Sequence, residues 1–381
     1  MLRAAGGVGM FTVRHALKVV DQLAPFAVAE EWDNVGLQIG AATAPVRRIA
    51  VALETTPAVV RSVARRRVDL LIVHHPLIFK SVRSLTRDTA TGALALDLIR
   101  AGVAVIAAHT NLDASPHGTN AALAQWLQLT EIAPLFDVPL APAPLKLAVY
   151  VPEGHEQSVI QAIARGGGGR IGPYDHCSFR VAGTGTYRPL PGARPFAGKV
   201  GRLASVAECR IEAEAPPSAV GGVLRAVRAV HPYEEMAYDL YPRQRIEAGC
   251  AMGLTGLLPQ ATTLSALAAH IRRSLPGAGA TAFVGKPSRP VRRVAIFTGA
   301  GRSAVERWRG QADALVTGEI DHHTAREAEA RGMAVIAAGH YATERPVAAF
   351  FAKRLRRSPE LRQHCVQVIA LTGVELPMTG A

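Results

Sequence analysis

The side chains best suited to chemistry in this chain are histidines and carboxylates that occur in three short groups. A pair of adjacent histidines is followed by two further pairs. In each of these, a histidine precedes an acidic residue by four positions. Imidazole and carboxylate ligands without thiolates suit zinc, iron, manganese or cobalt. Because one catalytic zinc usually takes fewer protein ligands, a carboxylate that bridges two divalent ions is the natural arrangement. The five candidate ligands are His74, His75, Asp113, His340 and Glu344.

Other polar residues near these groups are candidates for proton transfer or for orienting the ligands. The candidates for proton transfer are Glu319, His109 and His323, and those for a supporting or substrate-contacting role are Asp33, Asn34 and His322. Each group also has a simpler explanation. Asp33 and Asn34 suit a local turn, and Glu319 suits the first turn of a helix. A role at the site therefore requires that the fold bring them to the ligands.

The candidate ligands follow predicted strands in two related halves of the chain. Apolar runs at 47–51, 69–73 and 104–108 have counterparts, in the same order, at 292–296, 313–317 and 334–338. Short β-branched runs that alternate with helical patterns predict α/β units around a largely parallel sheet. Ligands bind outside the carboxyl ends of such strands. We therefore expect two related α/β halves that share one metal crevice.

A segment of different character separates the two halves. It follows a stretch rich in proline, and its predicted elements run in the order β-α-β-β-α-β of a ferredoxin-like α+β domain. The predicted organisation is an N-terminal α/β half at 10–140, an inserted domain at 142–246 and a C-terminal α/β half at 247–381.

Composition limits the class of protein. Hydrophobic residues make up 49% of the 381 residues and charged residues 19%, which excludes a mainly disordered chain. No apolar run approaches the roughly 18–20 residues of a membrane span. The four cysteines form no Cys-x-x-Cys pair and the first residues lack the apolar core of an export signal, so a cytoplasmic protein is expected. The net charge of +13 comes from scattered Arg side chains, which makes nucleic acid a less favoured partner.

Several motifs together resemble the NGG-one-interacting-factor-three-like family, whose members are often described as GTP cyclohydrolase I type 2 homologues with a dinuclear metal centre. The motifs are Trp-Asp-Asn-Val-Gly-Leu-Gln at 32–38, His-His-Pro-Leu-Ile-Phe at 74–79, His-Thr-Asn-Leu-Asp at 109–113, Thr-Gly-Glu at 317–319 and Gly-His-Tyr-Ala-Thr-Glu at 339–344. The resemblance implies that His75 and Asp113 bind one ion. It assigns the other ion to His74 and His340, with Glu344 as the bridge. It also implies a toroidal homohexamer.

The inserted segment resembles the PII/CutA-like domain of longer bacterial members, with His-Pro-Tyr-Glu-Glu at 231–235 as its marker. One position departs from the family pattern, because Leu254 stands where members often carry Arg. The implied function is a dinuclear metal-dependent hydrolase that acts on a nucleotide-like anion, with GTP ring opening as the family's description. The alternative is a metal-binding regulatory or interaction protein whose insert senses a small molecule or a partner.

Overall fold

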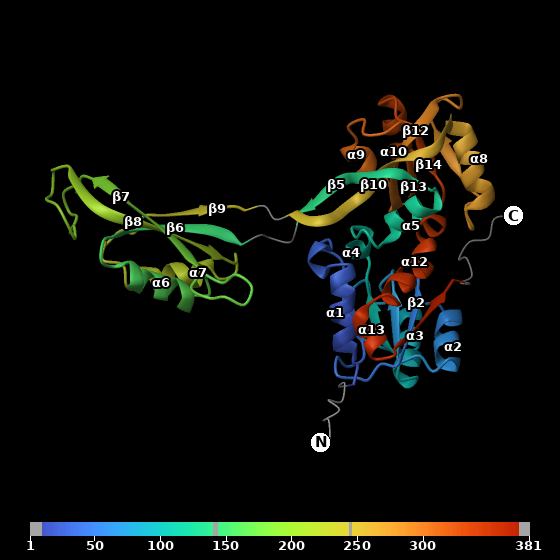
Figure 1. The fold of residues 1–381 in the computed structure, drawn as a ribbon, viewed down its shortest axis with the longest axis horizontal. Helices are drawn as coiled ribbons and strands as arrows, with labels where there is room; N and C mark the ends of the chain where they lie inside the picture. The colour runs from blue at the N-terminus through green and yellow to red at the C-terminus, as the bar shows by residue number, and fades with distance from the viewer. Residues whose placement is uncertain (1–9, 140–143, 244–245, 373–381) are drawn as a thin grey trace, which may run out of the picture. The chain divides into compact units, whose positions relative to one another are not determined.

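The computed structural model describes residues 10–139, 144–243 and 246–372, which form two compact units (Figure 1). The first unit combines the described residues up to 138 with those from 246 onward, and the second contains residues 139–245. No helix in the described part of the chain is long and apolar enough to cross a membrane.

The first sheet of the first unit is mostly parallel and buried on both faces. Its strand order is β1-β4-β3-β2-β15, with only β1 antiparallel to its neighbour. The strands are β1 (Gly36–Ile39), β2 (Arg48–Ala52), β3 (Leu70–Val73), β4 (Ala104–Ala107) and β15 (Gln367–Leu371). All four residues of β3 are buried, as a continuous apolar run in a covered parallel sheet requires.

Helices cover both faces of this sheet. On one face lie α1 (Val13–Leu23), α12 (Pro346–Leu355) and α13 (Pro359–Gln363), and on the other lie α2 (Pro57–Arg65) and α3 (Ala90–Arg100). Alternate residues of β2 enter the two cores, because successive side chains of a strand point to opposite faces. Ile49 and Val51 contribute to the first core, and Ala50 and Ala52 to the second.

The second sheet has the order β11-β14-β13-β12-β10-β5. Its strands are β5 (Thr130–Pro139), β10 (Ile246–Thr263), β11 (Ala282–Val284), β12 (Pro290–Ala300), β13 (Ala314–Glu319) and β14 (Val335–Ala337). Its helices are α5 (Thr119–Trp126) and α8 (Leu264–Ser274) on one face, with α9 (Arg302–Arg307) and α10 (His322–Ala330) on the other. Leu254 pairs with Ile296 in the sheet. Its side chain packs against the core that this sheet forms with α5 and α8.

The internal repeat is visible in the centre of both sheets. Strands β2, β3 and β4 are parallel and adjacent in that order, and so are β12, β13 and β14. The same side-chain contact recurs in each. The Asp69 carboxylate accepts two backbone N–H groups at the start of β2, both at 2.8 Å. The Asp313 carboxylate accepts two backbone N–H groups near the start of β12, at 2.9 and 2.8 Å. The predicted pair of related α/β halves is confirmed.

Each half of the chain nevertheless contributes to both sheets. Strand β15 and helix α12, from the C-terminal half, complete the first sheet and its core. Helix α5 and strand β5, from the N-terminal half, belong to the second sheet. These exchanged elements lie outside the three repeated segments, so the repeat alone gave no sign of the exchange. The exchange ties the two halves into one unit.

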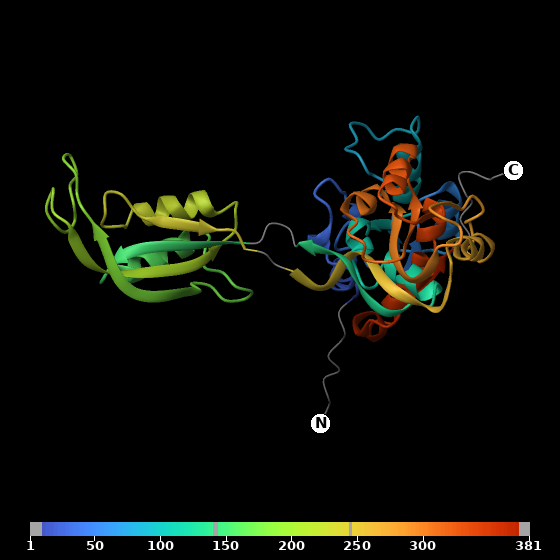
Figure 2. The same ribbon diagram turned by 90° about the horizontal axis from the view of Figure 1, so that it is seen from above.

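The second unit has the chain order β-α-β-β-α-β. Its elements are β6 (Leu145–Pro152), α6 (Glu156–Arg165), β7 (Ser178–Tyr187), β8 (Ala204–Ala215), α7 (Val220–Arg228) and β9 (Tyr238–Tyr241). The antiparallel sheet has the order β7-β8-β6-β9. Both helices pack on one face of it, where they bury Val159, Ile163, Val223 and Val227 (Figures 1 and 2). A single covered face is typical of an antiparallel sheet.

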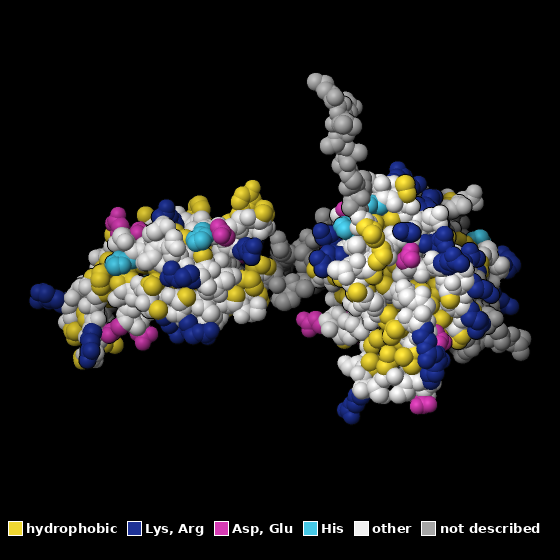
Figure 3. Space-filling model, turned by 90° about the horizontal axis from the view of Figure 1, so that it is seen from below, with side chains coloured by type: hydrophobic (Ala, Val, Ile, Leu, Met, Phe, Trp, Pro, Cys, Tyr) yellow, Lys and Arg dark blue, Asp and Glu magenta, His cyan; other side chains and the backbone are white. Residues whose placement is uncertain are grey.

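The positive charge is distributed over the surface. On the face shown in Figure 3, Lys and Arg side chains stand in several separate groups on both units, with other side chains between them. Some are paired, as Arg87 is with Asp97 and Arg302 with Glu306. This distribution matches the scattered placement expected from the sequence.

Candidate metal centre

The three groups of candidate ligands meet in the first unit, beyond the carboxyl ends of strands from both sheets. The histidine pair directly follows β3. Asp113 lies in the short helix α4 (Thr110–Asp113) after β4, and the last pair lies in α11 (His340–Glu344) after β14. Three overlapping sets of ligand atoms each lie within 4.8 Å of one another. The members of these sets are His74, His75, His109, Asp113, His340 and Glu344.

His74 presents an unpartnered nitrogen to two carboxylates. Its Nδ1 lies 3.1 Å from the Ala108 carbonyl oxygen, which identifies Nδ1 as the protonated nitrogen. Nε2 lies 3.6 Å from Asp113 Oδ1 and 3.8 Å from Glu344 Oε1, and it has no hydrogen-bond partner among the described residues although it is buried. Buried polar atoms are almost always paired, so a lone pair left in this position fits a metal ion.

His75 and His340 converge on the other oxygen of Glu344. Their Nε2 atoms lie 2.9 and 3.2 Å from Glu344 Oε2. The Nδ1 of His340 contacts Glu319 Oε1 at 3.1 Å, and the Nδ1 of His75 lies 3.9 Å from Glu54 Oε2. Each imidazole thus has an acceptor near Nδ1 and directs Nε2 inward, which is the usual arrangement around metal-binding histidines.

The nearest-neighbour grouping differs from the one that the family resemblance implied. Of the three sets, one joins His74 with Asp113 and Glu344, another joins His75 with His340 and Glu344, and the third joins His74, His75 and His109. In the first two sets His74 lies with Asp113 and His75 with His340, which is the reverse of the implied pairing. Glu344 is common to these two sets, as a bridging carboxylate would be.

The cluster holds protons tightly when it contains no ion. Burial lowers the pKa of His75, but the carboxylates of Glu344 and Glu54 outweigh it and raise that pKa to about 10. Glu344 likewise raises the pKa of His340 to about 9 against the effect of burial. Burial opposes ionisation of Glu344, yet three imidazoles hold its pKa well below the usual range. Burial raises the pKa of Asp113. A dication must therefore displace protons.

Asp33 and His109 form a charged support beside the ligands. Asp33 Oδ1 contacts His109 Nδ1 at 2.9 Å, and Oδ2 accepts the Thr110 backbone N–H at 3.0 Å and its hydroxyl at 2.6 Å. Burial raises the pKa of Asp33, but these hydrogen bonds prevail and lower it to about 2. The His109 ring lies 5.1 Å from the His74 ring, so both residues are brought to the cluster.

Three other candidates have different surroundings. The Asn34 side chain donates to the Ile78 carbonyl, so it holds the loop that follows the histidine pair. His322 and His323 begin α10 as exposed residues with their rings 5.7 Å apart. In the described structure, no hydrogen bond, ion pair or ring contact joins either histidine to the five candidate ligands.

Four residues at the cluster were not singled out as individual candidates in the sequence. Glu54 lies just beyond β2, so the strand-end rule that found the ligands could also have found it. Thr119, which donates to Asp113, comes from α5 and carries no such signal. Trp32 and Phe79 place their rings 5.9 Å apart, and each lies 6.2 Å from the His109 ring. They remain 60% and 47% exposed, so they form an open aromatic rim.

These features define an α/β protein with two related halves and a partly buried imidazole–carboxylate cluster where the halves meet. The profile of the Duf34/NIF3 (NGG1p interacting factor 3) family matches residues 11–375, and the chain belongs to this family. It is 38% identical over 330 residues to a GTP cyclohydrolase 1 type 2 homolog of Bacillus subtilis (strain 168), covering 86% of this chain and 87% of that protein. The homolog of Mycobacterium tuberculosis (strain ATCC 25618 / H37Rv) is 39% identical over 333 residues, with 87% of each covered.

Solved structures share the fold over nearly the whole chain. A Staphylococcus aureus protein superposes with a TM-score of 0.74 at 26% identity, covering 98% of this chain and all of that one. A Bacillus cereus protein related to NIF3 gives a TM-score of 0.67 at 32% identity, with the same coverage. The predicted α/β class and the predicted family are confirmed.

Proposed function

We propose that the cluster binds two divalent transition-metal ions, drawn from zinc, iron, manganese and cobalt. The observation that carries this proposal is the buried, unpartnered Nε2 of His74, which faces the carboxylates of Asp113 and Glu344. These three side chains would hold one ion. His75 and His340 would hold the second together with the other oxygen of Glu344. The donor set of imidazole and carboxylate, without thiolate, fits this group of metals.

The protein would act as a metal-dependent hydrolase. A pair of such ions supplies Lewis-acid activation of water and substrate near neutral pH. Glu319 fixes His340 through Nδ1 and, with its side chain 62% exposed, can exchange a proton with solvent. Asp33 fixes the Nδ1 side of His109, which leaves Nε2 of that ring to accept or return a proton. His323 is left out of this set, because it lies on the exposed start of α10.

The substrate class that fits the rim is a nucleotide-like anion. Trp32 and Phe79 offer exposed aromatic surface beside His109 on which a planar base can stack. Lys80 and Arg83 follow in the same exposed loop and supply positive charge for phosphate. The curated relatives are named GTP cyclohydrolase 1 type 2 homologs, which agrees with this class.

Two further features complete the proposal. From the family resemblance we infer a homohexamer, whose mass in light scattering would be about six times the 40.3 kDa of one chain. From the cysteine pattern we infer a cytoplasmic location, where a thiol such as that of Cys209 persists.

The test is a metal count followed by a substrate screen. Protein purified without chelators should contain two ions per chain, and the loaded protein should turn over a nucleotide in a panel of nucleotides and phosphodiesters. Glu319→Gln should lower kcat by about a hundredfold to ten-thousandfold with little loss of metal, because proton transfer by a positioned side chain contributes about that much. His323→Gln is the matched control and should leave kcat unchanged.

A second candidate function has an observation in its favour. The inserted unit contains a lined cavity of its own, which suits a regulatory or sensor protein with a structural metal centre. Two ions per chain with no turnover of any panel member, together with a lower melting temperature after metal removal, would favour this alternative over the hydrolase.

A further inference from the structure

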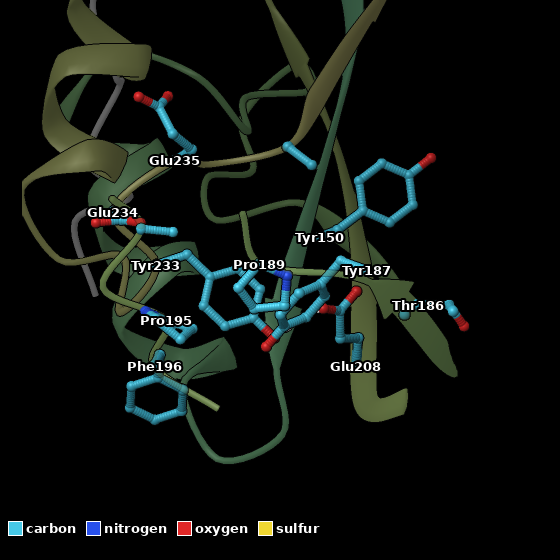
Figure 4. Close-up of a pocket in the computed structure, with 13 residues that line it drawn as sticks. Tyr150, Thr186, Tyr187, Pro189, Pro195, Phe196, Glu208, Tyr233, Glu234 and Glu235 are labelled. Atoms are coloured by element: carbon cyan, nitrogen blue, oxygen red, sulfur yellow. Dashed lines mark hydrogen bonds between the residues drawn. The ribbon is translucent and has the colours of Figure 1, made fainter. Parts of the chain in front are cut away.

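The second unit contains a cavity of about 490 Å³ that the proposed hydrolase site does not use (Figure 4). Its size suits a small molecule. Aromatic rings and carboxylates dominate its walls, and they come from β6, β7, β8, the segment between β7 and β8, and the 231–235 motif. The aromatic members are Tyr150, Tyr187, Phe196 and Tyr233, and the acidic members are Glu208, Glu234 and Glu235.

The 231–235 motif builds the aromatic wall. His231 is buried and contacts the Tyr150 carbonyl through Nε2 at 2.9 Å, while its Nδ1 accepts the Tyr233 backbone N–H at 3.1 Å. Tyr233 then packs against Tyr187 at 5.8 Å and against Phe196 at 6.0 Å between ring centroids. The motif therefore fixes the position of an aromatic side chain in the cavity, which explains its clustering of polar and aromatic residues.

Glu208 places a carboxylate against these rings. Its Oε1 accepts the Tyr233 hydroxyl at 2.8 Å, and a carboxylate has about four acceptor positions, so most of its capacity remains. The neighbouring strand makes room for it. A Cβ at Gly185 would lie 2.2 Å from the Glu208 carboxylate, although Gly185 has no positive φ that would itself require glycine. The missing side chain thus serves to accommodate the carboxylate.

The charge of the lining selects the ligand. Among the described residues, three carboxylates and no Lys, Arg or His line the cavity, in a chain whose net charge is +13. Glu234 is engaged by the Arg194 backbone N–H at 2.8 Å, and Glu235 points away from the rings in Figure 4, which leaves Glu208 as the acid among them. Carboxylates would repel a nucleotide or another anion. We propose that this cavity binds a small organic ammonium cation, with its charged ammonium group at Glu208 and against the rings of Tyr187 and Tyr233.

Calorimetric titration of the full chain tests the proposal with two pairs of probes that differ in charge. Choline is compared with 3,3-dimethyl-1-butanol, and n-butylammonium with n-butanol. At least one cation should bind about tenfold more tightly than its uncharged partner, as a desolvated cation–π and carboxylate contact predicts. If neither cation exceeds its partner at concentrations up to about 10 mM, the proposal is wrong.

Two variants and a matched control place the ligand in this cavity. Glu208→Gln keeps an acceptor for Tyr233 but removes the charge, and Gly185→Ala forces the carboxylate aside. Each should weaken the cation about tenfold and leave the uncharged probe unaffected. Gly183→Ala, on the same strand with no atom within 4 Å of the added Cβ, should change nothing. Equal effects of the two glycine substitutions, or full binding by Glu208→Gln, would contradict the assignment. Unchanged circular dichroism and metal content verify that each variant is folded.

Discussion

Glu344 is the residue on which the arrangement of the cluster depends. It is 3% exposed, one oxygen faces His74, and the other lies within 3.2 Å of both His75 and His340. When the site contains no ion, the charges of His75 and His340 hold this buried carboxylate. The same position offsets the repulsion between two dications that lie close together, which is large at low effective dielectric.

Glu344→Ala should therefore reduce the occupancy of both ions, whereas His74→Ala should mainly lose one. The physical reason is that Glu344 belongs to both of the sets that contain a carboxylate, whereas His74 belongs to only one of these two. Equilibrium dialysis followed by elemental analysis measures this, with thermal melts to verify folding. His323→Ala, at an exposed position away from the ligands, is the control. A folded Glu344→Ala variant that keeps both ions would transfer the bridging role to Asp113.

Metal binding should release about two protons per chain at pH 7.5 and weaken as the pH falls. The pKa values of His75 and His340, about 10 and 9, exceed the ordinary value of 6.5, so both imidazoles are charged in the metal-free protein at neutral pH. Calorimetric titrations in buffers of different ionisation enthalpy count the protons. Heats that do not depend on the buffer would show that the imidazoles were already neutral.

The same pKa values set the stability of the metal-free protein. Both histidines have a folded-state pKa above the unfolded value of 6.5, so their ion pairs with Glu344 contribute fully below pH 6.5. That contribution falls as the pH rises above 6.5 and is lost once the pH has passed through 9 to 10. The melting temperature of the metal-free protein should therefore fall between pH 6.5 and pH 10, and His75→Gln should flatten the decline. A melting temperature that stays constant from pH 6.5 to 10 would contradict the ion-paired state.

At this scale the sequence indicated which residues lie together, and it indicated less of their surroundings. The rule that ligands gather beyond the carboxyl ends of parallel strands selected the five candidate ligands, which the structure brings together with His109. It could not decide which oxygen each imidazole faces, because that depends on side-chain directions at the end of β3. Nor could it show that His322 and His323 stay exposed, since a helix start beside a strand end looks the same in either case.

Among the elements, the repeated strands share one stabilising contact. Asp69 and Asp313 each accept two backbone N–H groups at the start of the neighbouring strand, where the chain enters the sheet. A carboxylate that satisfies two such donors fixes both the register and the entry angle of that strand. The contact explains why an acid precedes both β3 and β13 in otherwise apolar runs.

Asp69→Ala and Asp313→Ala should each lower the free energy of unfolding by about 1–3 kcal/mol, because hydrogen bonds to a charged group are worth about 1.5–3 kcal/mol and these sites are partly solvated. Urea unfolding of the metal-loaded protein measures the change. Asp97→Ala, which removes only an exposed ion pair with Arg87, should stay within about 1 kcal/mol. An equal effect of all three substitutions would show that the backbone contacts add nothing specific.

The exchange of elements between the halves could not be predicted from the repeat. The matched segments cover only the three central strands of each sheet, and they give the correct order and direction. Strands β15 and β5 have no counterpart in the other half, so nothing in the sequence assigns them to a sheet. Apolar patterns show that a segment is buried, but the partner against which it packs is a property of the tertiary structure.

At the scale of the whole molecule, the second unit interrupts a pair of neighbouring strands. Strand β5 ends at Pro139 and β10 begins at Ile246, and the two are adjacent in the second sheet (Figure 1). Gly253 lies beside Leu135 and Gly256 lies beside Leu129, which shows that the two strands run in opposite directions. The insert therefore occupies the place of a hairpin turn, and every candidate metal ligand lies in the first unit.

Replacing residues 140–245 by Asn-Gly should leave a folded protein that binds metal like the full chain. A two-residue Asn-Gly turn is favoured between antiparallel strands, so it can close β5 onto β10 without strain. The two units bury separate cores, so removal of one leaves the other's core complete. Metal counting and circular dichroism measure the result, and the shortened protein should lose binding of whichever ammonium cation the full chain binds, because the cavity is absent. A shortened protein with native-like circular dichroism and no metal would show that the insert is needed to assemble the metal centre.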